Sequence, residues 1–190
     1  MAAEMRMLVG LLVALLIGAG CSVEKRPVPP YAKNRANKNR RSPKRQVASP
    51  LGEYVVKSEA PSAKKPERDI VITRPGEKRE ILRFPFQRQV DVVWAPDESG
   101  VAVVDLVLQN ETRVVIFALP TGQPLYELRR EHVCQLNPQL PCGESYTHVY
   151  FSNVVWLAPD RIEVTVDMVN PLEPNLPARI HSTLTVSFPH

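Results

Sequence analysis

Hydrophobic and polar residues alternate along much of the chain that follows residue 70. The clearest case is residues 161–168, where one set of positions holds Ile162, Val164, Val166 and Met168 and the other holds Arg161, Glu163, Thr165 and Asp167. Successive side chains of a β-strand point to opposite faces of a sheet. The period of two therefore predicts a strand with one buried face and one solvent-facing face.

The same period, together with β-branched residues and closely spaced turn residues, predicts strands throughout the second part of the chain. They are expected at residues 70–73, 80–84, 90–94, 101–108, 113–119, 124–128, 148–156, 161–168 and 183–188. A short helix around residues 126–133 is the one competing pattern. Residues 70–190 are enough for one domain of ordinary size with one core.

A different pattern opens the chain. Residues 7–20 are apolar and follow a single basic residue, Arg6. Such a stretch is shorter than the roughly 20 residues that span a bilayer, but it fits the hydrophobic region of an export signal. Residues 1–20 are therefore predicted to be a signal peptide.

Residues 21–69 differ from both neighbouring parts in composition. Residues 22–69 hold thirteen Lys/Arg against five Asp/Glu, a net charge of +8, and seven prolines, whereas residues 70–190 carry a net charge of −4. A segment so poor in apolar residues cannot bury enough surface to offset its chain entropy. We expect a disordered basic linker from residue 22 to about residue 69, followed by a β-domain over residues 70–190. The linker is either a solvated spacer or an additional contact to an anionic surface.

The end of the apolar stretch, Ile17-Gly-Ala-Gly-Cys21, resembles the lipobox of bacterial lipoproteins. In that family the cysteine becomes the mature N-terminus and carries fatty-acyl chains such as palmitate. The resemblance implies lipidation at Cys21, and Ser22 in place of an Asp implies the periplasmic face of the outer membrane. An ordinary secretory signal, or an uncleaved anchor with an incidental cysteine, is the alternative.

A second resemblance covers about forty residues. The run from Trp94-Ala-Pro-Asp through Thr121-Gly122 to Leu128 is similar to one blade of a WD40- or TolB-type β-propeller, and Trp156-Leu-Ala-Pro-Asp160 repeats its start. A propeller needs at least four blades of about forty residues, more than this domain holds. We therefore expect a four-stranded antiparallel meander near residues 90–128 within a mainly β fold, a small antiparallel β-sandwich or twisted two-sheet domain. Both tryptophans are expected in the core.

Two further cysteines, Cys134 and Cys142, bracket a loop that contains two prolines. In an oxidising envelope they are predicted to form a disulfide. His132 and His148 flank them, so a zinc site with two nitrogen and two sulfur ligands is the alternative, although the spacing matches no familiar zinc pattern.

Nothing in the chain commits it to a reaction or to a cofactor. The sequence lacks a Gly-x-Ser-x-Gly elbow, a phosphate-binding glycine loop and a His-Glu-x-x-His motif. Ser145 and His148 are a nucleophile and a base close in sequence, but no third group orients the base. The carboxylates Asp97, Asp105, Asp160 and Asp167 are expected on the solvated surface.

The function expected from these features is that of a lipid-anchored envelope protein whose β-domain binds a protein or an envelope polymer. The expected contact surface is the loop that carries Leu136, Pro138, Leu140 and Pro141, because function concentrates on loops held by a rigid scaffold. A loop that merely packs over the end of the domain is the structural alternative. The alternative function is that of an envelope hydrolase, or of a metal-binding module that uses His132, Cys134, Cys142 and His148. Nucleic acid is not an expected partner of an exported chain.

Overall fold

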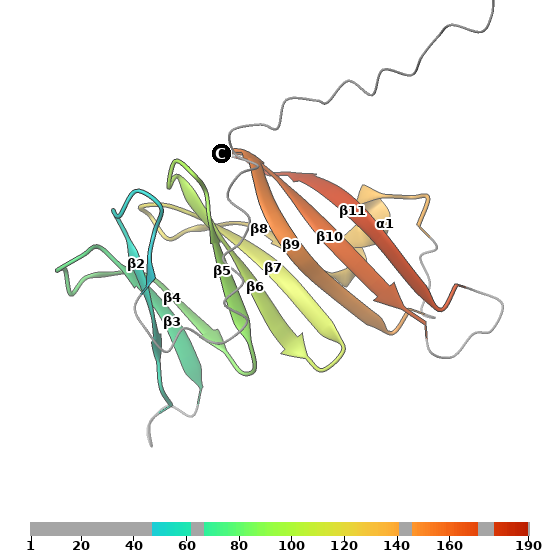
Figure 1. Ribbon diagram of the computed structural model, residues 1–190, viewed down its shortest axis with the longest axis horizontal. Coiled ribbons are helices and arrows are strands. Elements are labelled where there is room, and N and C mark those ends of the chain that lie inside the picture. The colour runs from blue at the N-terminus through green and yellow to red at the C-terminus, as the bar shows by residue number, and fades with distance from the viewer. Residues whose placement is uncertain (1–46, 62–66, 141–145, 171–176, 190) are drawn as a thin grey trace, which may run out of the picture.

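The computed structural model describes residues 47–61, 67–140, 146–170 and 177–189. Within these ranges the chain forms eleven strands and one helix (Figure 1): β1 (Val47–Ala48), β2 (Val55–Glu59), β3 (Arg68–Thr73), β4 (Glu80–Phe86), β5 (Val90–Trp94), β6 (Gly100–Leu108), β7 (Glu111–Ala118), β8 (Pro124–Leu128), α1 (Arg130–Leu136), β9 (His148–Ala158), β10 (Arg161–Val169) and β11 (Arg179–Ser187). The mainly β fold with two sheets is confirmed.

The strands pair almost entirely with their neighbours in sequence. A four-stranded sheet has the order β1-β2-β3-β4, and a seven-stranded sheet has the order β11-β10-β9-β7-β6-β5 with β8 also paired to β7. The four-stranded antiparallel meander expected near residues 90–128 is confirmed as β5 to β8. One parallel pair, Glu111 with Val149, joins this meander to β9.

The seven-stranded sheet folds so that the molecule has three layers. We call β1–β4 the first layer, β5–β8 the middle layer and β9–β11 the third layer; Figure 1 shows them side by side in this order. One core lies between the first and middle layers and contains Ile70, Phe84, Val103 and Phe117 among others. The other core, here called the second core, lies between the middle and third layers. The middle layer is therefore covered on both faces.

This double coverage explains the sequence of β6. Val101, Ala102 and Val103 are all fully buried, because alternate residues of one strand enter the two different cores. Strands buried on both faces are expected to be continuously hydrophobic rather than alternating. By contrast, β10 keeps the alternation expected for one buried face.

The two tryptophans occupy corresponding places in successive layers. Trp94 ends β5 and stacks on Tyr54 of the first layer, with ring centroids 6.2 Å apart. Trp156 lies in β9, and its Nε1 donates a hydrogen bond to the Val93 carbonyl of the middle layer at 3.1 Å. Each ring thus packs against the layer that precedes its own, and the expected core position of both is confirmed.

The linker expected to reach residue 69 is too long. Residues 47–48 and 55–59 form β1 and β2, and β3 begins at Arg68. The turn between β1 and β2 is fixed from afar, because the buried carboxylate of Glu98 accepts hydrogen bonds from the backbone N–H groups of Leu51, Gly52 and Glu53. Local composition misses this because the stabilising partner lies more than forty residues later.

Candidate functional site

The helix of the expected contact surface is fixed to the second core by one residue. Val133 of α1 is 1% exposed and belongs to the core between the middle and third layers. At the start of α1, the Arg129 backbone N–H donates to Nδ1 of His132 at 3.1 Å. At its end, Asn137 N–H makes the last helical hydrogen bond, to the Val133 carbonyl at 2.9 Å. The helix stops there because Asn137 has φ of −140° and ψ of 87°, and Pro138, which follows, disfavours a helical conformation for it. The helix predicted around residues 126–133 begins at Arg130 because Tyr126 and Leu128 belong to β8.

The four predicted contact residues fall in different environments. Leu136 is 37% exposed and Pro138 is exposed, whereas Leu140 is half-buried and packs against the second core. Pro141 lies outside the described residues. Leu136 and Pro138, which we call the α1 surface, are therefore the part of this loop that is open to a partner.

The cysteine predictions rest partly on residues that are not described. Cys134 lies in α1, is half-buried and is disulfide-bonded. Cys142, its predicted partner, and Cys21, the predicted lipidation site, lie outside the described residues. The pairing of Cys134 with Cys142 and the acylation of Cys21 stay predictions.

The histidines of the alternative metal site have other neighbours. The His132 ring lies against Tyr126, with centroids 5.9 Å apart, and Nδ1 of His148 lies 3.1 Å from the Thr147 hydroxyl. In the described ranges no group of three or more His, Cys, Asp or Glu residues is arranged to hold a metal ion. Cys142 of the metal hypothesis and Ser145 of the hydrolase hypothesis both lie outside those ranges.

The prediction that Asp105 is a solvated surface residue is wrong. Asp105 is 3% exposed, and its Oδ2 lies 3.0 Å from Nη2 of Arg113. Burial raises the pKa of this carboxyl, while Arg113 acts in the opposite direction. The Arg113 guanidinium also lies over the Phe84 ring of the first layer, 5.3 Å from its centroid, and stays partly exposed. The burial of Asp105 and its pairing with Arg113 indicate a structural role for this carboxylate.

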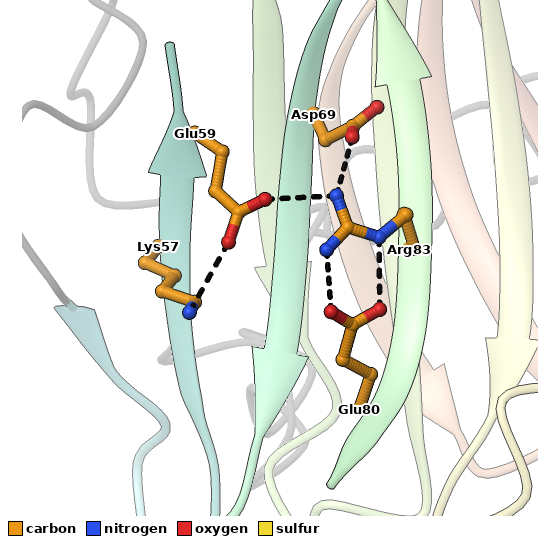
Figure 2. A network of polar contacts seen from close by, with 5 residues as sticks. All are labelled: Lys57, Glu59, Asp69, Glu80 and Arg83. Carbon is orange, nitrogen blue, oxygen red and sulfur yellow. Dashed lines mark hydrogen bonds and ion pairs between the residues drawn. The ribbon is translucent and has the colours of Figure 1, made fainter. Parts of the chain in front are cut away.

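A cluster of charges that the sequence pattern does not predict lies on the outer face of the first layer (Figure 2). We call it the Arg83 cluster, and it consists of Lys57, Glu59, Asp69, Glu80 and Arg83. Arg83 donates to Glu80 through two nitrogens, with Nε 2.8 Å from Oε2. Its Nη1 lies 2.8 Å from Glu59 and also contacts the buried Asp69. Glu59 in turn lies 3.2 Å from the ammonium of Lys57.

The cluster holds its glutamates in the charged form. Hydrogen bonds from Arg83 lower the pKa of both Glu59 and Glu80, and the three carboxylates raise the pKa of Arg83. Each side chain of the cluster has at least one ion-pair partner within it, and together they cover the outer face of the sheet. The cluster was hard to predict because Lys57 and Glu59 lie in the segment that composition assigns to the linker.

The Arg83 cluster gives a pH dependence that can be measured. A carboxyl whose pKa is lower in the folded chain stabilises the fold above its unfolded pKa, about 4.3 for Glu, and this stabilisation is lost as the pH falls. We expect the free energy of unfolding, measured in urea between pH 3 and 7, to fall less on acidification in Arg83→Met than in the unsubstituted chain. Arg88→Met, at an exposed position, is the control and should leave the slope unchanged. Equal slopes in all three chains would contradict a charge-holding role for Arg83.

Helices long and apolar enough to cross a membrane do not occur within the described ranges. In comparisons with known proteins, the chain matches no protein-family model, no curated protein and no solved structure.

Proposed function

We propose that this chain is a lipid-anchored protein of the bacterial cell envelope whose β-domain binds an envelope protein or polymer through the α1 surface. The observation that carries the proposal is the arrangement of α1. Val133 fixes the helix to the second core, whereas Leu136, one turn further on, is exposed. An apolar side chain on a rigidly held surface segment can serve as an anchor for a partner, because little conformational entropy is lost on binding.

The anchor in this proposal is Cys21. It rests on the apolar stretch 7–20 and on the small residues that precede the cysteine. One acyl chain binds a membrane only marginally, whereas two or more anchor a protein stably, at about 0.8 kcal/mol per buried CH₂. Ser22 favours the periplasmic face of the outer membrane as the destination.

The segment between the anchor and the fold supplies reach and charge. Residues 22–46, upstream of β1, hold nine Lys/Arg against one Glu, a net charge of +8, so all the excess positive charge of the predicted linker lies there. A chain of this length spans at most about 90 Å. In the proposal it positions the β-domain and adds a weak, salt-sensitive attraction to anionic surfaces.

A capture experiment separates the two parts of the chain. Cells would express the full chain, Leu136→Asp, the matched control Leu108→Asp, which alters another exposed leucine, and a chain with the nine basic residues of 22–46 replaced by Gln. Partners would be cross-linked and quantified from solubilised envelopes at physiological salt. We expect Leu136→Asp to reduce capture at least about tenfold, as loss of an interface anchor does, with little effect of the other changes.

The opposite pattern would contradict the proposal. If the chain with the neutral segment loses its partners while Leu136→Asp keeps them, recognition lies in residues 22–46. The β-domain would then serve only as a folded end-piece.

A further inference from the structure

A small open cavity lies at one end of the first layer, between the turn that joins β3 to β4 and the turn that joins β7 to β8. Its volume is about 220 Å³, and its lining residues are Arg74, Glu77, Arg79, Glu80, Ile81, Pro120 and Thr121. In Figure 1 the β3–β4 turn lies at the left and α1 at the right, so the cavity is separate from the α1 surface. Nothing in the proposed function uses it.

Both walls of the cavity are fixed by local backbone structure. In the β3–β4 turn, Glu77 N–H donates to the Arg74 carbonyl at 3.1 Å, with Pro75 and the positive-φ Gly76 between them, as a tight turn requires. On the other wall, Gly122 has φ of 72° and lies so close to β4 that a Cβ would come within 2.0 Å of the Ile81 carbonyl oxygen. The β7–β8 turn is therefore in direct backbone contact with β4.

The charges at this cavity are not balanced. Glu80 is occupied by the two-point contact with Arg83 in the cluster of Figure 2. Neither the Arg74 nor the Arg79 side chain makes an ion pair or a hydrogen bond with another described residue. Lys78, which lies between them in sequence, is exposed. Glu77 is left as the single lining carboxylate that opposes two unpaired guanidinium groups. The cavity is therefore suited to an anion.

We propose that this cavity binds a phosphate monoester group between Arg74 and Arg79. A guanidinium offers a planar fork of donors that matches phosphate oxygens. Two guanidinium groups therefore favour a doubly charged phosphate ligand over a ligand with a single carboxylate. The Thr121 hydroxyl adds a donor, and Ile81 and Pro120 supply an apolar wall for the carbon atoms next to the phosphate. Cavities that bind drug-sized ligands have volumes of about 300 Å³ or more. This smaller cavity therefore fits a phosphate with one small substituent, such as a sugar ring.

The test is a calorimetric titration of the full chain, solubilised in a non-ionic detergent, with glucose 1-phosphate. We expect Arg74→Ala/Arg79→Ala to weaken binding by about tenfold or more, because each charge-assisted hydrogen bond contributes on that scale. Arg88→Ala/Arg161→Ala removes the same charge from two exposed positions elsewhere and should leave binding unchanged. Glu77→Gln should tighten binding about two- to fivefold, because it removes a like charge at the rim.

Further probes separate the sources of phosphate. Glucuronate, with one carboxylate on the same ring, should bind clearly more weakly than glucose 1-phosphate. If the arginine dependence appears only with vesicles that contain phosphatidate, the phosphate site stands and its source is a lipid. The proposal is overturned if no phosphate probe distinguishes Arg74→Ala/Arg79→Ala from Arg88→Ala/Arg161→Ala, or if glucuronate binds as tightly as the phosphate. Since none of these probes involves Leu136, failure here leaves the proposed function untouched.

Discussion

Replacing Trp156 with Ala is expected to lower the free energy of unfolding by about 3–5 kcal/mol, the usual cost of deleting a buried aromatic side chain. Trp156 is 2% exposed, and its ring meets Phe188 edge-on at 5.8 Å. Its indole N–H pairs with the Val93 carbonyl, which would lose that partner. Because the ring connects the third layer to the middle layer, its loss opens a cavity between them. Urea unfolding followed by circular dichroism measures the change.

Two further variants make this test specific. Thr185→Ala, on the exposed face of β11, should change the free energy of unfolding by no more than about 0.5 kcal/mol. Gly100→Ala would place a Cβ 2.9 Å from the Trp156 ring, so it should be less costly in a Trp156→Phe background than alone. If Trp156→Ala costs no more than Thr185→Ala, the second core does not hold the layers together.

The polar outer faces of the end layers explain why three layers suffice. The Arg83 cluster covers the outer face of the first layer. On the third layer, Oδ1 of Asp167 lies 2.9 Å from Nη2 of Arg179 and 3.0 Å from Nδ1 of His181. Stacked architectures need end units with a polar outer face, since no further layer covers them. The molecule therefore ends in ion pairs where a larger stack would continue with apolar residues.

Local patterns predict the strands and the meander well, but they do not predict the contacts between distant parts of the chain. The alternation in β10 is a property of a short segment, and this strand appears where expected. The Pro-Asp pairs after Trp94 and Trp156 are also local, and each follows the end of a strand, β5 or β9. The link between Glu98 and the β1–β2 turn connects residues more than forty positions apart, and no period or composition signals it. The same reason explains why β1 and β2 were assigned to the linker.

The candidate sites show the same difference between features with a local sequence signal and features that depend on distant residues. Leu136 could be singled out because apolar residues in a proline-containing loop stand out locally. The alternation along β6 does not reveal that Asp105 is buried, because the first layer covers that face of β6. Two strands of this layer, β1 and β2, lie in the segment predicted to be linker. Arg74 and Arg79 carry a local signal that was overlooked, a Pro-Gly turn flanked by arginines, but the second wall of their cavity comes from residues 120–121.

Cys21→Ala is expected to abolish membrane association and leave the β-domain folded. The apolar stretch is too short to anchor the chain by itself, so the proposed anchor depends on acyl chains attached to that thiol. Cys21 lies upstream of β1, so the substitution changes no residue of the two described cores. Membrane fractionation with carbonate extraction measures association, and thermal unfolding of the released protein checks the fold.

Ser22→Ala is the matched control for this variant, because it changes the next residue without removing the thiol. It should fractionate with membranes as the unsubstituted chain does. If Cys21→Ala stays in membranes and resists carbonate, residues 7–20 act as a true anchor, and the lipoprotein proposal fails.

The most direct test of the lipid-anchored function is the intact mass of the protein extracted from cell envelopes, combined with a fragment spectrum of its N-terminus. The proposal predicts a mature chain that begins at Cys21 and carries a diacylglyceryl group on the sulfur. A chain that begins at any other residue, or at an unmodified Cys21, would contradict it.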